Sequence, residues 1–196
     1  QALIKIIASR IRQMNNELMA FYEVGRLLSL SKPIDYLLDN VLEIITQAAT
    51  ARRGMILLEN NTTGSFEPKA VKGYKEEKLR GVDFGHEASL SGYALKRGRP
   101  QIIPDSSLKS RMKEFLPQGY ERKTMLFFPF GSGGNIIGLI IIADKKDEPG
   151  KKAFFDANDI NLVSAITRQI EAALENIQFH TDAESITKLK RQYFKF

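Results

Sequence analysis

The chain of 196 residues carries a net charge of +6 and is 43% hydrophobic, values that fit one well-packed globular domain with some additional helix. It contains no cysteine, which excludes disulfides, cysteine-ligated zinc, thiol nucleophiles and thioether-linked chromophores together. Its two histidines, His86 and His180, are far apart in the sequence, so we expect no metal site. The basic residues are scattered and accompany no nucleic-acid motif, a distribution that favours a solvated basic surface over nucleic-acid binding.

The sequence indicates neither a membrane span nor a secretory signal. Its longest apolar run, residues 136–143, is too short to cross a bilayer and contains glycine. The chain opens at Gln1 directly in a helical pattern, and we expect a cytoplasmic protein. Because Gln1 stands where an initiator methionine is expected, we interpret the chain as a segment of a longer protein.

A long amphipathic helix is predicted over residues 1–30. Its apolar positions alternate spacings of three and four residues, which is the pattern of a coiled-coil heptad seam. The seam, broken by one glycine, consists of Ile4, Ile7, Ile11, Met14, Leu18, Phe21, Gly25 and Leu28. Only another helix can bury such a seam, and a second copy of the chain, its own C-terminus or both could supply that helix.

The next segment predicts a second helix and two strands. Pro33 suits a first helical turn, and the broad apolar stripe from Ile34 to Ile45 suits packing on a sheet. Residues 55–58 form a buried-strand run, and a polar turn leads to a returning strand over residues 66–72. Pro68 predicts that the returning strand lies at an edge or is irregular.

The middle of the chain is less regular. We expect short helices over residues 75–79 and 89–96, with Ser89 or Ser91 near the N-terminus of the latter, an extended stretch at 82–84 and a strand at 101–103. Residues 105–122 predict a long loop, and loops of this length inside compact domains are usually functional or mobile. Two apolar runs, residues 125–130 and 136–143, flank a glycine-rich turn and predict a β-hairpin, so the sheet is at least partly antiparallel.

The last predicted helix begins near Asp156 and extends to about Phe179. Acidic residues in its first turn are typical of a helix N-terminus. Its apolar residues form two faces, of which we expect one to pack on the sheet and the other on a partner helix. One face contains Ile160, Val163, Thr167, Ile170, Leu174 and Ile177, and the other contains Leu162, Ile166 and Ala173. The predicted fold class is therefore α+β.

Several local motifs, in this order, resemble the GAF family over roughly residues 34–179. They are the helix start Ser91–Leu95, the segment Gly98–Asp105 with its Gly-x-Pro-x-x-x-x-Asp pattern, the hairpin Phe128–Ile142, and Phe155 followed after three residues by Asp159 and a long helix. The resemblance implies a GAF/PAS-like central antiparallel sheet flanked by helices. Long N- and C-terminal helices would form a dimerisation bundle on one face, while loops and a short helix would close over a small-molecule pocket on the other.

The resemblance also implies candidate ligand-binding residues, none of them catalytic. These are Phe84, His86, Ser91, Gly92, Tyr93, Asp105, Ser106, Phe115 and Phe128. Each has a plainer alternative: a helix cap for Ser91 and Gly92, a turn for the residues at 105 and 106, core packing for the aromatic residues and a surface loop for the histidine. No residue indicates which ligand or cofactor is bound.

Departures from the family's patterns narrow the function. Cyclic-nucleotide-binding members carry an Asn-Lys…Phe-x3-Asp-Glu pattern, in which this chain has Asp144 for the asparagine and Ile160 for the glutamate; this argues against cyclic nucleotides without excluding them. Covalent bilin attachment and the family's methionine-sulfoxide reductase activity both require cysteine, so both are excluded. We therefore expect this segment not to be an enzyme.

The tail, residues 181–194, resembles the first turn of a GGDEF diguanylate cyclase domain, with a polar, basic helix end as the alternative. We divide the chain into a signalling and dimerisation helix (1–30), a GAF domain (31–180) and a linker or start of an output domain (181–196). The predicted function is a non-catalytic sensor that forms a homodimer through its terminal helices and signals to a C-terminal output domain, a diguanylate cyclase. The alternative is a ligand-free structural dimerisation module in a signalling protein such as a histidine kinase or a transcription regulator.

Overall fold

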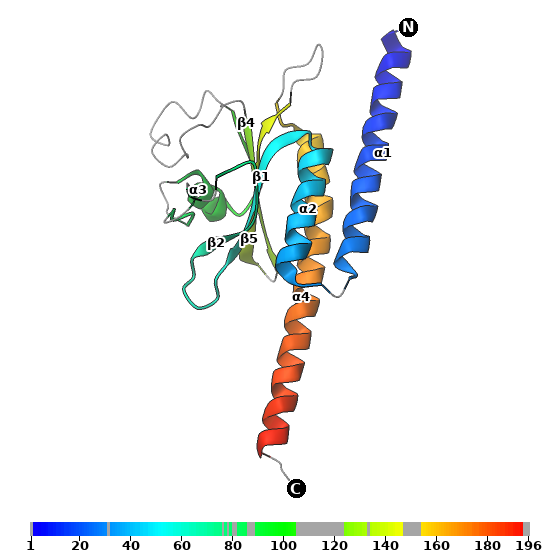
Figure 1. The fold of residues 1–196 in the computed structure, drawn as a ribbon. Coiled ribbons are helices and arrows are strands. Elements are labelled where there is room, and N and C mark those ends of the chain that lie inside the picture. Colours follow the sequence, from blue (N-terminus) through cyan, green and yellow to red (C-terminus); the bar gives the residue numbers. More distant parts are fainter. Residues whose placement is uncertain are drawn as a thin grey trace.

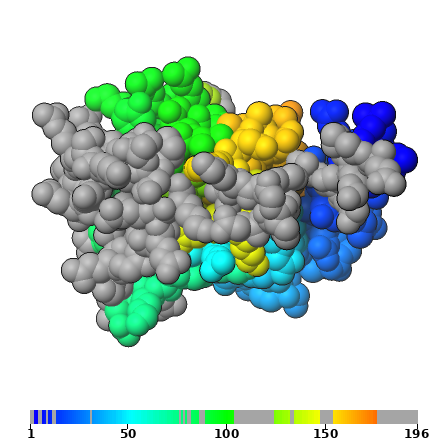
Figure 2. Space-filling model, turned by 90° about the horizontal axis from the view of Figure 1, so that it is seen from above, coloured from blue at the N-terminus to red at the C-terminus, as the bar shows by residue number. Residues whose placement is uncertain are grey.

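The structure, a computed structural model, describes residues 2–30, 32–75, 77, 79, 82–85, 89–104, 124–132, 134–146 and 154–193. Its elements are α1 (Ala2–Leu28), α2 (Ile34–Ala48), β1 (Ala51–Glu59), β2 (Phe66–Lys72), α3 (Leu90–Arg97), β3 (Gln101–Pro104), β4 (Thr124–Ser132), β5 (Asn135–Lys145) and α4 (Ala157–Tyr193). In Figure 1, α3 covers one face of the sheet, α2 and α4 cover the other, and α1 lies outside these two helices. Figure 2 shows the same order of layers from above. We call the two faces of the sheet the α3 face and the helical face.

The sheet has five strands in the order β2-β1-β5-β4-β3, and all neighbouring pairs are antiparallel. The predicted α+β class and the hairpin between β4 and β5 are confirmed. Pro68 lies in the edge strand β2, opposite Leu57 beside a register shift, as its missing N–H donor predicts. At the bulge in β4, Gly131 is required because a β-carbon there would overlap the carbonyl oxygen of Asn135.

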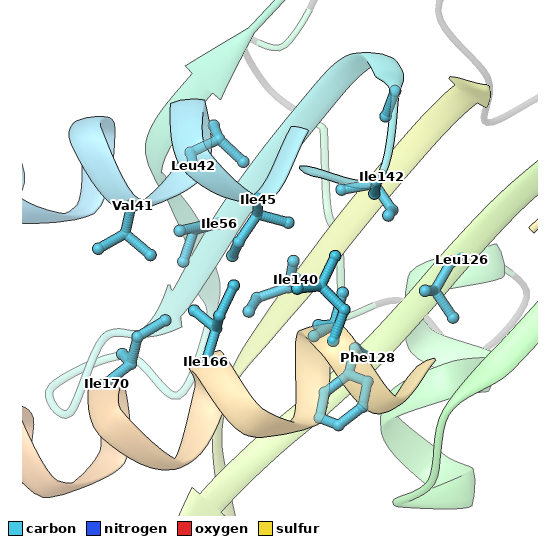
Figure 3. Close-up of a cluster of buried hydrophobic side chains, with 14 of the residues drawn as sticks. Val41, Leu42, Ile45, Ile56, Leu126, Phe128, Ile140, Ile142, Ile166 and Ile170 are labelled. Carbon is cyan, nitrogen blue, oxygen red and sulfur yellow. The ribbon is translucent and has the colours of Figure 1, made fainter. Parts of the chain in front are cut away.

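The main core fills the space between the helical face and the two helices that cover it. The apolar stripe predicted for α2 contributes Leu38, Val41 and Ile45, and all three side chains are fully buried. These meet Ile56, Ile140 and Ile142 from the central strands and Val163, Ile166 and Ile170 from α4 (Figure 3). As far as Leu174, residues of both predicted apolar faces of α4 are therefore used within the chain, where α4 contacts the sheet, α1 and α2.

Helix α1 packs against α2 and α4 mainly through residues other than the predicted seam, to which the last seam residue, Leu28, is added. Among the α1 side chains that the structure describes, Ala20, Val24 and Leu27 are buried, and we call them the inner face. The seam residues from position 4 to position 21 are exposed by 44% to 71%. Within the described part of the chain, α4 therefore does not cover the seam, and the seam's partner is left open.

Helix α4 starts with reciprocal capping bonds. The Asp156 side chain accepts hydrogen bonds from the amides of Asn158 and Asp159, while the Asp159 carboxylate accepts from the Asp156 amide. The predicted start is confirmed, but the predicted end near Phe179 is wrong because the helix continues to Tyr193. Among the described residues, no helix combines the length and apolar character that crossing a membrane requires.

Candidate functional site

The candidate ligand site lies where α3 packs on the sheet. Ser89 caps α3: its Oγ accepts a hydrogen bond from the Gly92 amide at 2.9 Å and lies 3.0 Å from the Ser91 hydroxyl. The helix ends at Arg97 and is capped by Gly98, whose φ of 62° is in the left-handed region that favours glycine. The sequence left open which serine forms the cap, and the structure identifies Ser89. Because the Gly92 amide is bonded to this cap, it is not available to an anion.

Beneath α3, the α3 face carries a second, smaller apolar cluster. Its side chains come from the three central strands, from β3, from α3 and from the segment before α3. They are Met55, Leu57, Leu79, Phe84, Leu90, Ala94, Ile103, Met125, Phe127, Leu139, Ile141 and Ala143. The buried hydroxyls of Ser89 and Ser91 stand at its border. A ligand received here would meet mostly apolar and thioether side chains with a few hydroxyl groups at the edge.

The structure brings together three of the predicted site residues. Phe84, Ser91 and Gly92 are buried within or beside this cluster. Tyr93 is half-buried, with the guanidinium carbon of Arg97 5.0 Å from the centre of its ring. The predicted residues His86, Asp105, Ser106 and Phe115 lie outside the described residues. The role of these residues in ligand binding remains a prediction.

The expected position of Phe128 is wrong, because this residue lies on the helical face. Its side chain is 8% exposed and belongs to the main core with Ile140, on the side that α4 covers (Figure 3). Its neighbour Phe127 occupies the α3 face instead, and sequence reasoning missed it. Alternate residues of a strand point to opposite faces, but the run from Met125 to Phe130 is apolar throughout. It therefore contains no polar residue that would indicate which of its residues point to which face of the sheet.

Two ion pairs join the end of β5 to its neighbours. The Lys145 ammonium lies 2.6 and 2.7 Å from the two carboxylate oxygens of Asp159 in the first turn of α4, and 5.5 Å from the centre of the Phe155 ring. Burial raises the pKa of Asp159 above its ordinary value, and the hydrogen bonds from Lys145 and from the Asp156 amide partly oppose this rise. Lys145 and Asp159, two positions at which the chain matches the cyclic-nucleotide pattern, thus anchor α4 to the sheet.

The second ion pair accounts for the aspartate at position 144. Its φ of 56° is in the left-handed region, which asparagine and aspartate tolerate better than most residues. Its Oδ2 lies 2.9 Å from Nε of Arg53 on the neighbouring strand β1. Arg53 neutralises the charge that aspartate introduces where the family pattern has asparagine. Within the described ranges, no three histidine or acidic residues gather closely enough to hold a metal ion.

Comparisons with known proteins agree with this arrangement. The sequence model described as GAF domain matches residues 31–175. The chain is 23% identical over 197 residues to the Nif-specific regulatory protein of Azospirillum brasilense, an alignment that covers 96% of this chain and 30% of that protein. The chain spans less than a third of the length of the curated relatives it matches.

Among solved structures, the chain resembles the GAF domain of the Acinetobacter phosphoenolpyruvate-protein phosphotransferase. The TM-score is 0.69 at 16% identity, and the match covers 82% of this chain and 93% of that domain. The free methionine-R-sulfoxide reductase of Neisseria meningitidis is similar with a TM-score of 0.64 at 14% identity, over 81% of this chain and 88% of the reductase. At these identities both likenesses show the fold.

Proposed function

Since this chain belongs to the GAF domain family, we propose that it is a non-catalytic regulatory module that binds a small ligand beneath α3 and signals through α1 and α4 to a C-terminal output domain. The observation that carries the proposal is the continuity of α4. This helix packs on the helical face through Ile170 and continues as helix to Tyr193. A change in the sheet therefore acts on the same rigid element that leaves the domain.

Polar contacts connect α4 to the sheet at two heights. The Lys145–Asp159 pair fixes the first turn of α4 to the end of β5. Three turns later, the Glu171 carboxylate accepts a hydrogen bond of 2.8 Å from the Gly131 amide at the bulge in β4. Because β4 and β5 also form the floor beneath α3, a ligand that prefers one arrangement of these strands would shift the position of α4.

The chemistry of the α3 face supports a ligand with an apolar body. Met55 and Met125 supply flexible thioethers to the cluster, and such side chains adapt their shape to a bound molecule. A non-catalytic role is supported by the sequence, because the chain has no cysteine and so cannot supply a thiol for sulfoxide reduction. The likeness to the sulfoxide reductase then concerns the fold and not the reaction.

Two observations bear on the output domain and on the alternative function. The resemblance of residues 181–194 to a GGDEF start favours a diguanylate cyclase, while the name of the Azospirillum relative favours another kind of regulatory protein. The apolar side chains that fill the α3 face favour the second candidate function, a ligand-free dimerisation module in a histidine kinase or a transcription regulator.

Ligand binding is tested by thermal-shift and calorimetric screening with nucleotides, amino acids, haem and oxo-acids. We expect one class to raise the unfolding midpoint, because a ligand that binds only the native state stabilises it. Phe127→Leu should abolish the shift. The adjacent variant Phe128→Leu, on the other face, should lower the basal midpoint and keep the shift. If no class binds, the ligand-free module is the correct function.

A further inference from the structure

We infer that the ligand beneath α3 is an amphiphilic anion, whose apolar body lies on the α3 face and whose carboxylate-like group binds the Arg53 guanidinium in exchange for Asp144. The inference rests on the proposed function, because it names the chemical class of that ligand and the contact that its binding breaks. Asp144 and the anionic group of the ligand then compete for one cation, Arg53, at the border of the α3-face cluster.

The position of Arg53 on β1 places its side chain on the α3 face. Alternate residues of a strand share a face, and Met55 and Leu57, two and four residues further along, both belong to the α3-face cluster. The intervening Gly54 faces α2 instead, because a β-carbon there would lie 2.7 Å from Cδ1 of Leu42. The Arg53 side chain is 24% exposed, so its charge borders the apolar cluster and is still accessible to water.

The segment after β2 holds the arginine in place. Tyr74 packs against the α3-face cluster, and the guanidinium carbon of Arg53 lies 5.8 Å from the centre of its ring. Gly73 has a φ of 76°, and a β-carbon there would lie 2.9 Å from Cγ of Arg53, so this glycine lets the backbone approach the arginine stem closely. A guanidinium restrained in this way loses little conformational freedom when it binds a carboxylate, whose geometry its planar fork matches.

Asp144 indicates both the kind of group that Arg53 accepts and why that group can be replaced. Its Oδ2 lies 2.9 Å from Nε of Arg53, and its side chain is only 7% exposed, so the arginine already binds one carboxylate out of water. Asp144 makes this contact at a φ of 56°, a conformation that stores backbone strain in residues other than glycine. The carboxylate of a ligand would carry none of this strain, which favours the exchange.

The cluster beside Arg53 selects the rest of the ligand. Four residues of strand separate Arg53 from Leu57, a distance of about 13 Å along which the α3 face is apolar and includes the thioether of Met55. An apolar chain of medium length fits this surface while its charged end reaches the guanidinium. A cationic end would be repelled by Arg53, and a neutral end would leave the ion pair with Asp144 intact. The net charge of +6 also favours the approach of anions.

The exchange at Arg53 would reach α4 through the next residue of the chain. Asp144 directly precedes Lys145, whose ammonium donates to both carboxylate oxygens of Asp159 in the first turn of α4. On the far side of Lys145, the Lys146 amide donates a hydrogen bond of 2.8 Å to the Thr50 carbonyl and fixes the end of β5. Displacing the Asp144 side chain removes the contact that supports its strained backbone, so the position of Lys145 and of the first turn of α4 would change.

Thermal-shift and calorimetric titrations test the ligand class with straight-chain carboxylates from butanoate to octanoate, each compared with the alcohol and the alkylammonium ion of the same length. We expect only the carboxylates to raise the unfolding midpoint. Arg53→Met should weaken carboxylate binding at least about tenfold, because a charged hydrogen-bonding partner is lost. The matched control is Arg52→Met, which removes an exposed arginine from the same strand and should change the affinity less than about twofold. Asp144→Asn removes the competing carboxylate and should tighten binding roughly threefold.

The double variant Arg53→Met/Asp144→Asn guards against misfolding, because it leaves no buried carboxylate without its cation. It should also fail to bind carboxylates, and circular dichroism of each variant verifies the fold. Three results would overturn the inference: alcohols that bind as tightly as carboxylates, an unchanged affinity in both Arg53 variants, or weaker binding in Asp144→Asn. A neutral or cationic ligand whose midpoint shift Phe127→Leu abolishes would overturn the inference and leave the proposed function standing. If no compound of any class binds, both fail.

Discussion

Replacing Lys145 with methionine isolates the ion pair between the end of β5 and the first turn of α4. The substitution keeps an unbranched apolar side chain but removes the ammonium group, and the Asp159 carboxylate stays buried at 6% exposure with the Asp156 amide as a remaining donor. Removing one partner of a buried ion pair costs about 3–5 kcal/mol. Because the Lys145 side chain is 20% exposed, we expect a smaller loss, about 2–3 kcal/mol in the free energy of unfolding near neutral pH.

The loss should depend on pH in a direction set by Asp159. Burial already raises the native pKa of this carboxyl above its ordinary 3.8, and Lys145 opposes the rise. Without Lys145, the native pKa rises further, so the native state retains a proton that the unfolded chain releases. Stability is then lost as pH increases from the unfolded pKa through the native pKa. The deficit of Lys145→Met should consequently be smaller near pH 4 than near pH 7.

Urea unfolding at both pH values measures the effect, with comparison to the double variant Lys145→Met/Asp159→Asn. The asparagine oxygen can still accept from the Asp156 amide, but no buried charge remains, so we expect the double variant to recover half or more of the loss. Equal stability of Lys145→Met and the unmodified chain at pH 7 would refute the reasoning. So would a deficit that is the same at both pH values and is not recovered in the double variant.

Substitutions at three further positions probe the backbone of β4, of β5 and of the turn between them. Gly131→Ala places a β-carbon on the carbonyl oxygen of Asn135 and should lower the free energy of unfolding by more than about 2 kcal/mol or prevent folding. Gly134→Asn, at a φ of 88° with open space around it, should lower the free energy of unfolding by less than about 1 kcal/mol. Thermal unfolding of both variants measures the difference. Asp144→Asn keeps a residue that tolerates a φ of 56° and loses the charge beside Arg53. It should lower the free energy of unfolding by about 1 kcal/mol. Asp144→Ala should lower it further, because alanine is also strained at this φ. Urea unfolding midpoints compare the two variants, and equal losses would contradict the backbone argument.

Sequence reasoning was most successful where residues of limited conformational range mark a boundary. Pro68 indicated the edge strand, the glycine-rich turn after Phe130 indicated the β4–β5 hairpin, and Asp156 indicated the start of α4. Each of these residues either lacks a donor, tolerates a positive φ or supplies a capping oxygen, so its effect is local and can be read from neighbours in the sequence.

Prediction failed where the sequence was uniformly apolar or uniformly polar along an element. The uniformly apolar run in β4 did not indicate which of its residues point to which face of the sheet, so Phe128 was expected on the face that Phe127 occupies. The end of α4 was expected near Phe179, where apolar periodicity stops. However, no glycine or proline follows before residue 196, and polar helix-forming residues can extend a helix without an apolar stripe.

The inner face of α1 shows a further limit of periodicity. The heptad pattern identifies the predicted seam, but Ala20, Val24 and Leu27 lie at positions between its members and pack against the chain's own helices. One helix thus carries two surfaces made of different residues, and the heptad pattern identifies only the more exposed one. The two surfaces meet near Gly25, where Gln169 of α4 contacts the backbone of α1. A displacement of α4 would therefore reach α1 first at this point.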